Sequence, residues 1–99
     1  MPALNFTLSR CSQEYSFMIA EGTVTNETTD SLKNVEAVIA FKDASGNFVT
    51  SEDALIDYNP ILPGQTSPFK ITATYNPAMA TCEVSFKDLM GGTISASGG

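Results

Sequence analysis

The sequence contains no histidine and no tryptophan, and only five of its 99 residues are basic. Without histidine, neither a Ser-His-Asp nor a Cys-His catalytic arrangement can form, and two cysteines are too few for a structural zinc site. Eleven acidic side chains against five basic ones give a net charge of −6. Such a surface repels the phosphates of nucleic acids and anionic membranes, so we expect neither as a partner.

Long apolar runs are also missing. No stretch approaches the ~18 consecutive apolar residues of a membrane helix, so we expect no direct insertion into a membrane. The N-terminus, MPALNFTLSR, lacks the basic start and the continuous apolar segment of a secretory signal. If the protein is exported, we expect its signal or anchor to lie outside these 99 residues.

The composition is that of one small folded domain. Hydrophobic residues make up 42% of the chain and charged residues 16%, and serine and threonine supply much of the polar surface. Threonine is β-branched and suits a half-wet pleated sheet. We expect a single domain over residues 1–99, with an ordered core over about 4–96 and a disordered terminal Gly-Gly.

Several short segments alternate apolar and polar residues, which is typical of half-buried strands. The apolar positions in phase are Leu4, Phe6 and Leu8; Val35, Ala37, Ile39 and Phe41; Phe69, Ile71, Ala73 and Tyr75; and Cys82, Val84 and Phe86. The segment TISAS, residues 93–97, is expected to form either a short last strand or a frayed end. About seven strands separated by turns, without a convincing helical period, predict an all-β antiparallel β-sandwich of two sheets.

Turn residues punctuate these segments. Asp43 and Gly46 in DASGN predict a hairpin turn, and Pro63-Gly64 predicts a type II turn before the strand that Pro68 begins. The strand after DASGN is expected to break around Glu52–Asp53.

Residues 15–26, YSFMIAEGTVTN, change phase along their length. Either a bulge near Glu21–Gly22 switches the faces, or both faces are covered. If the second half faces the core, Tyr15, Phe17 and Ile19 lie outside, beside Val38 on a neighbouring strand, and form an apolar patch for a partner or a second copy. The alternative is a register switch that buries all of them.

Cys11 and Cys82 are 71 positions apart and form either a disulfide or two buried free thiols. A bridge over that span would stabilise the fold by about 4 kcal/mol in the chain-entropy model. The chain lacks the buried tryptophan of antibody domains, and Ala80 stands where their conserved tyrosine would precede the second cysteine. A bridge would therefore join the first strand, or its exit loop, to a late strand.

Four acids offer oxygen ligands near one corner: Asp43, Glu52, Asp53 and Asp57. Calcium prefers such ligands, but DASGN lacks the second acidic position of a calcium loop. The alternative is a solvated acidic edge. Paired carboxylates alone, without a cleft, do not indicate catalysis, so we expect no enzymatic activity and no cofactor other than calcium.

An ordered set of elements resembles the FxLYD domain family. These are GTVTN at 22–26, NVEAVIAFKDASGNFV at 34–49, LPG at 62–64 and PF at 68–69. The resemblance spans about residues 15–86, although in IAFKD only Asp43 fits the motif that gives the family its name. It implies an immunoglobulin-like β-sandwich of bacteria or archaea, often within exported or membrane-anchored proteins. The matched residues lie in turns and core, so the resemblance implies no active site.

Taken together, these features predict a non-catalytic interaction or spacer module of an exported or cell-envelope protein. Its partner would be another protein or a second copy. The alternative is a sandwich that binds calcium or a small ligand through its acidic loops.

Overall fold

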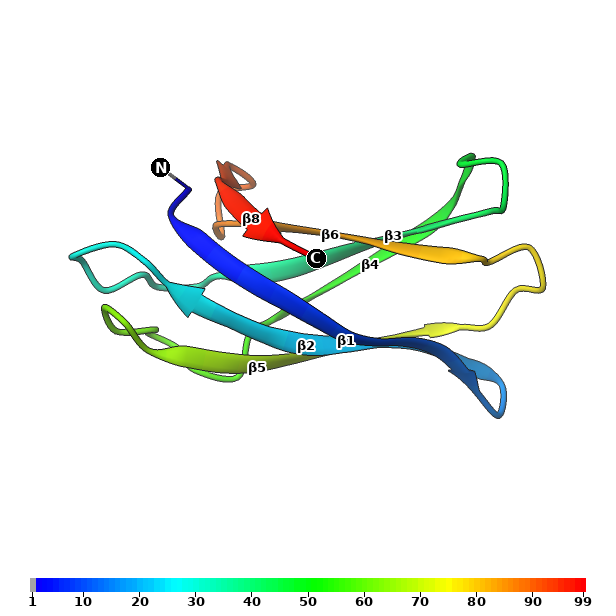
Figure 1. Cartoon of the computed structure of the whole chain (residues 1–99), viewed down its shortest axis with the longest axis horizontal. Coiled ribbons are helices and arrows are strands. Elements are labelled where there is room, and N and C mark those ends of the chain that lie inside the picture. The colour runs from blue at the N-terminus through cyan, green and yellow to red at the C-terminus, as the bar shows by residue number, and fades with distance from the viewer. Residues whose placement is uncertain (1) are drawn as a thin grey trace.

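The computed structural model describes residues 2–99, which form eight β-strands in two stacked layers (Figure 1). The strands are β1 Leu4–Glu14, β2 Phe17–Asn26, β3 Glu36–Lys42, β4 Phe48–Leu55, β5 Thr66–Thr74, β6 Thr81–Lys87, β7 Thr93–Ile94 and β8 Ala96–Gly98. The predicted all-β sandwich is confirmed. No helix in the described residues is long and apolar enough to cross a membrane.

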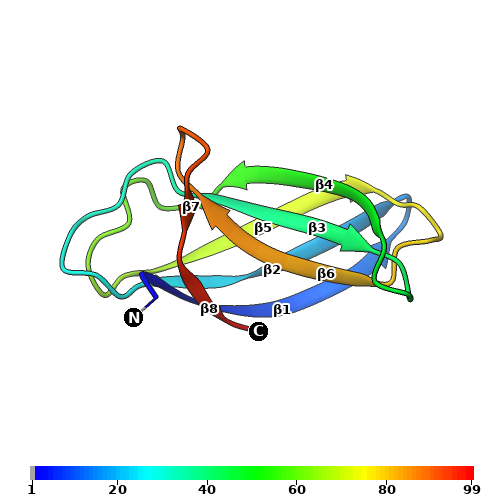
Figure 2. The ribbon, with the colours of Figure 1, turned by 90° about the horizontal axis from the view of Figure 1, so that it is seen from above.

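The two sheets have four strands each, in the orders β5-β2-β1-β8 and β4-β3-β6-β7. All neighbouring strands are antiparallel except β1 and β8, which run parallel. The chain passes between layers at β2–β3, β4–β5, β5–β6 and β7–β8, in an immunoglobulin-like arrangement. Seen from above, β1 and β8 lie along one side of the sandwich, and β4 and β5 lie along the other (Figure 2).

The core lies between the sheets and follows the alternation in the sequence. In β5 and β3 every second residue is buried, as the period of two requires. Phe69 of one sheet meets Phe86 of the other edge-to-face, with ring centroids 5.7 Å apart, and Phe6 lies 5.6 Å from Phe86. These aromatic contacts hold the layers together beyond the area that they bury.

A bulge divides β1 opposite Glu21 and Gly22 of β2, whereas the bulge predicted within residues 15–26, which would have switched the faces of that segment, does not form. The register shifts between Leu8 and Arg10, opposite Gly22 and Glu21 of β2, so that Ser9 is the extra residue. The bulge lets β1 continue to Glu14, beyond the alternating positions Leu4, Phe6 and Leu8, while the inner face of β2 stays in phase throughout.

The turns follow the expected chemistry. The Asp43 carboxylate accepts hydrogen bonds from the N–H groups of Ser45 and Asn47, and Gly46 has φ +85°. Gly64 has φ +77°, and the N–H of Gln65 donates to the Leu62 carbonyl at 2.9 Å, which closes the turn.

Asn26, at the end of β2, organises the long connection to β3. The side chain is fully buried, and its Nδ2 donates to the carbonyls of Asp30 and Ile61. Its Oδ1 accepts from the N–H and the hydroxyl of Thr28. One buried amide thus satisfies four polar groups of two loops, which explains its place in the core.

Three strand predictions were wrong in detail. β4 runs unbroken through Glu52–Asp53, because both residues pair with β3. β5 begins at Thr66, so Pro68 lies within the strand, which is tolerated because β5 is an edge strand. β8 reaches Gly98, two residues past the predicted limit of the ordered core.

Candidate functional site

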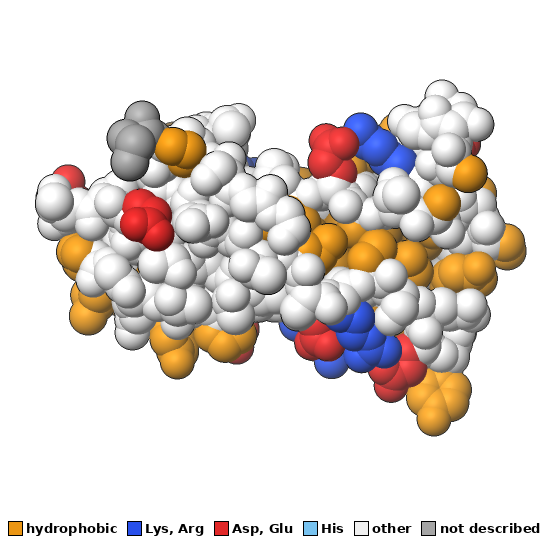
Figure 3. Space-filling view, in the orientation of Figure 1, with side chains coloured by type: hydrophobic (Ala, Val, Ile, Leu, Met, Phe, Trp, Pro, Cys, Tyr) orange, Lys and Arg blue, Asp and Glu red, His pale blue; other side chains and the backbone are white. Residues whose placement is uncertain are grey.

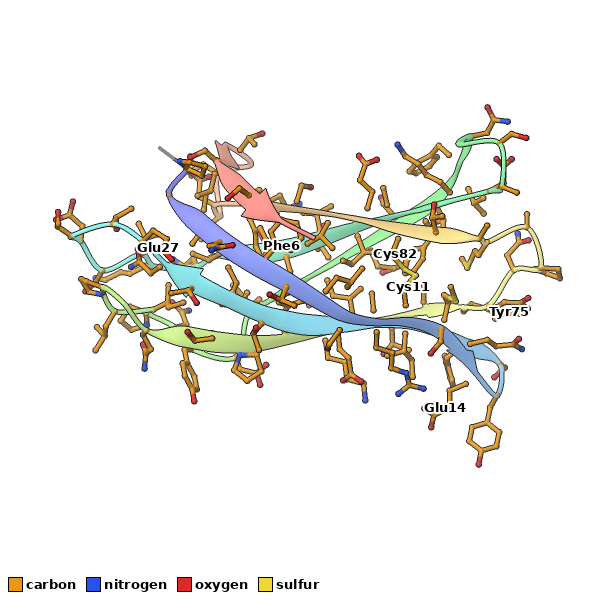
Figure 4. The ribbon with its side chains drawn as sticks, viewed as in Figure 1. Phe6, Cys11, Glu14, Glu27, Tyr75 and Cys82 are labelled. Carbon is orange, nitrogen blue, oxygen red and sulfur yellow. A yellow bond between two sulfur atoms is a disulfide. The ribbon has the colours of Figure 1, made fainter. Side chains whose placement is uncertain are left out.

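Cys11 of β1 and Cys82 of β6 form a disulfide between the two sheets, with Cα atoms 6.1 Å apart (Figure 4). Of the two alternatives that the sequence leaves open, the structure has the bridge. The bulge makes it possible: before Ser9 the even-numbered residues of β1 face inward, and after it the odd-numbered Cys11 does. Without the extra residue, Cys11 would point away from the facing sheet.

The disulfide lies in an opening along one side of the sandwich. We call this side the open flank and define it by Ser9–Glu14 of β1 and Thr81–Ser85 of β6. β8 pairs with β1 only over Leu4–Phe6, and β7 pairs with β6 only at Phe86 and Lys87. Within residues 2–99, no further strand pairs with the outer edges of these two segments. Two strand edges therefore lie unpaired, one in each sheet.

Apolar side chains form the floor of the open flank. Leu8, Cys11, Cys82 and Val84 pack against the core but stay half-buried. Figure 3 views this side, and hydrophobic side chains line a hollow between the two layers there. Surface of this kind, continuous with a core, marks a contact site more often than scattered exposed residues do.

Ion pairs flank the hollow on both sheets. Arg10 contacts Glu14 and, at 3.5 Å, Glu21, while Lys42 contacts Glu83 at 2.7 Å. The hydrogen bond with Glu14 raises the pKa of Arg10 above its ordinary value, although these groups remain in contact with solvent. An apolar floor with a polar, charge-paired rim is the usual anatomy of a protein-binding surface.

The opposite side of the sandwich carries a recess between the edge strands β4 and β5. It has a volume of 290 Å³, and its lining residues are Val49, Thr50, Glu52, Ala73, Thr74, Tyr75, Asn76 and Met79. Glu52 pairs with the inward-facing Ile39, so its carboxylate lies on the inner side of this edge. An inward charge on an edge strand opposes the docking of another strand.

The four acids considered for calcium do not come together. No group of three or more potential metal ligands occurs within residues 2–99. Asp43 is held by its own turn, Asp53 forms an ion pair with Lys87 at 2.9 Å on the outer face, and Glu52 lies on the inner side of β4. Asp57 is exposed in the loop after β4. Their nearness in sequence therefore does not produce a ligand cluster.

The aromatic residues expected to form a patch are likewise separated. Tyr15 and Phe17, at the β1–β2 hairpin, are 87% and 47% exposed, whereas Ile19 is 6% exposed. Val38 belongs to β3 in the other sheet, because the neighbours of β2 are β1 and β5. The predicted patch of all four residues does not form, and neither does the register switch that would bury them all. Tyr15 and Phe17 remain an exposed pair at the hairpin.

Sequence reasoning missed the open flank. The available signal was a difference in length: the closing segment TISAS is far shorter than the strands that it borders. A strand of two or three residues cannot cover neighbours of seven and eleven.

Comparison with known proteins bears on the fold. No protein-family model matches the chain, and no curated protein matches it, so the FxLYD resemblance stays a prediction. Among solved structures, the structure of IrmA from Escherichia coli is similar to this chain, with a TM-score of 0.64 at 9% sequence identity. The match covers 99% of this chain and 92% of that one. At this identity, the chain shares with IrmA a β-sandwich fold.

Proposed function

We propose that this protein is a non-catalytic interaction module that binds another protein in an extracytoplasmic compartment, either secreted or on the cell envelope. The observation that carries the proposal is the open flank, where two unpaired strand edges border an apolar floor. Exposed edges of this kind are normally covered or blunted in proteins that act alone. We therefore attribute the uncovered flank of this protein to a partner protein that covers it in a complex.

The disulfide supports the proposal of an extracytoplasmic compartment. Bridges between distant parts of a small domain form and persist in oxidising surroundings, such as the periplasm or the cell surface, and are rare in the cytosol. Cys11–Cys82 spans 71 positions and joins the two sheets at the flank itself. It fixes the spacing between β1 and β6, so the proposed binding surface is already formed before a partner arrives.

Site-specific photo-cross-linking tests the proposal. A photoreactive amino acid replaces Thr81, at the open edge of β6, in the cells that produce the protein. The matched control replaces Thr23, also an exposed threonine, in β2, which has a paired strand on each side. We expect one discrete cross-linked protein from position 81 and none from position 23. Equal products from both positions, or no discrete product from position 81, would contradict the proposal.

A further inference from the structure

We propose that the open flank binds an extended segment of a partner protein, which pairs with the protein as an added strand, parallel to β1 and in line with β8. This inference rests on the proposed function and specifies its mode of binding. Addition of a strand to an exposed sheet edge is a general form of peptide recognition, in which backbone hydrogen bonds provide affinity and side-chain pockets provide specificity.

The protein already contains a template for this mode. β8 pairs parallel with Leu4–Phe6, and the N–H of Leu8 donates to the carbonyl of Gly99 at 3.3 Å. The side chains of Ile94 and Ala96 pack against the core from this segment. β7 and β8 therefore cover the stretch of this side next to the open flank, and a segment that continues the line of β8 would meet the edge of Ser9–Glu14 next.

The other long strand edges, those of β4 and β5, carry residues that oppose strand addition, and the open flank carries fewer of them. β4 carries the inward-placed Glu52, and β5 carries Pro68 and Lys70. Such residues discourage strand addition. The inward positions of the open flank hold no charged side chain: they are Cys11, Gln13, Cys82 and Val84, with the apolar Leu8 beside them. This contrast selects the β1–β6 side as the receptive one.

The flank also determines what the segment must look like. Six residues of β1 are open, which corresponds to roughly 20 Å of extended chain. Alternate side chains of the segment would face Leu8, the disulfide and Val84, so they should be apolar and small or β-branched. The side chains between them would face solvent and the ion pairs of Arg10 and Lys42.

A second copy of this chain is a poorer occupant. Each copy carries a net charge of −6. Within that total, the ion pairs at the rim of the flank contain three acidic side chains, Glu14, Glu21 and Glu83, and two basic ones, Arg10 and Lys42. Bringing two such surfaces together costs electrostatic free energy, whereas a neutral or basic segment of another protein avoids that cost.

A designed extension of the chain tests the site. Eight residues that alternate valine and threonine are added directly after Gly99, which places them in line with β8 at high effective concentration. We expect Tm to rise by about 5 °C. We also expect amide hydrogen exchange across Ser9–Glu14 to slow by about fivefold, because the added strand raises the free energy of local opening by the amount that the rise in Tm reflects. The control extension has proline at every second position, cannot donate the ladder hydrogen bonds, and should change neither quantity.

Two substitutions in the extended chain locate the contact. Val84→Thr replaces one methyl group on the floor of the flank with a hydroxyl group. Val38→Thr makes the same change on the outer face of the same sheet. We expect Val84→Thr to weaken docking about fourfold, the factor for one buried methyl group, and Val38→Thr to leave docking unchanged.

Three results would overturn the inference. The first is the absence of slowed exchange at Ser9–Glu14 with the alternating extension, and the second is protection of β4 in place of β1. The third is dimerisation of the unextended chain that Val84→Thr abolishes, since this would assign the flank to a second copy. The cross-linking experiment separates the two proposals. A partner cross-linked at position 81 without docking of the extension leaves the proposed function standing and removes strand addition. Docking of the extension without a cross-linked partner would remove the proposed function and the partner segment with it, and would leave only a flank that accepts an added strand.

Discussion

Gly22 of β2 lies directly against the backbone of Thr7 in β1: a Cβ atom at position 22 would stand 2.0 Å from the Thr7 carbonyl oxygen. The contact lies beside the bulge at Ser9, where the two strands change register. The absence of a side chain at Gly22 therefore permits the bulge, and the bulge turns Cys11 toward Cys82.

Gly22→Ala should consequently disturb both strands. We expect it to lower the free energy of unfolding by about 1–3 kcal/mol, since the backbone of β1 must move to admit the methyl group. Urea denaturation monitored by circular dichroism measures the loss. Gly99→Ala is the control, because a Cβ there meets nothing within 4 Å. Equal stability of the two variants would show that the strands do not need this close approach.

Gly64→Val isolates the strain of a turn. A Cβ at this position has open space around it, so the cost comes from the backbone, which has φ +77°. We expect a loss of about 1–3 kcal/mol for valine. Gly64→Asn should lose less, because asparagine tolerates the left-handed region. Melting curves compare the variants, and unchanged curves for valine would rule out the type II turn.

Removal of the disulfide should be costly. The double substitution Cys11→Ala with Cys82→Ala is expected to lower the free energy of unfolding by about 4 kcal/mol, because the unfolded chain regains the entropy of a long open loop. Chemical denaturation measures this value. Protein isolated from its own cells under alkylating conditions should show no free thiol by mass spectrometry, and two alkylated cysteines would place it in a reducing compartment.

Acid should weaken the β3–β4 hairpin through Asp43. Hydrogen bonds from the backbone N–H of Asn47, and also of Ser45, lower the pKa of Asp43 below its ordinary value of 3.8. A carboxyl group with a lower pKa in the folded state stabilises the fold above its unfolded pKa and loses this contribution as the pH falls through the folded pKa.

Asp43→Asn provides the comparison, because its amide oxygen accepts the same hydrogen bonds without titrating. We expect the wild-type protein to be the more stable at neutral pH and the difference to shrink as the pH falls below about 3.8. Denaturation curves over this pH range measure the difference, and one that does not vary with pH would remove Asp43 as its source.

Much of the fold followed from local chemistry. The alternation in residues 69–75 and 82–86 predicted buried faces correctly, and Asp43, Gly46 and Gly64 predicted their turns, because in each case neighbouring residues decide the backbone conformation. The bulge was expected on the wrong strand, because a glycine such as Gly22 indicates only that two backbones approach closely. The strand that carries the extra residue, here at Ser9, depends on the pairing partner.

The site was less accessible from the sequence. Grouping Asp43, Glu52, Asp53 and Asp57 by position in the chain ignored the fact that successive residues of a strand point to opposite faces. The patch with Val38 required β2 and β3 to be neighbours, and sheet order is a property of the whole topology. The open flank depends on how little of β1 and β6 the final residues cover, and the short length of TISAS indicates this only once its neighbours in the two sheets are known.

The position of the Cys11–Cys82 bridge has a mechanical consequence. If the protein is pulled by its two ends, only the ten residues before Cys11 and the seventeen after Cys82 can be drawn out before the load passes to a covalent bond. Those tails extend by roughly 90 Å at most. Everything between the cysteines is shielded from stretching, so a string of such domains would yield by a short, fixed length and then resist tension.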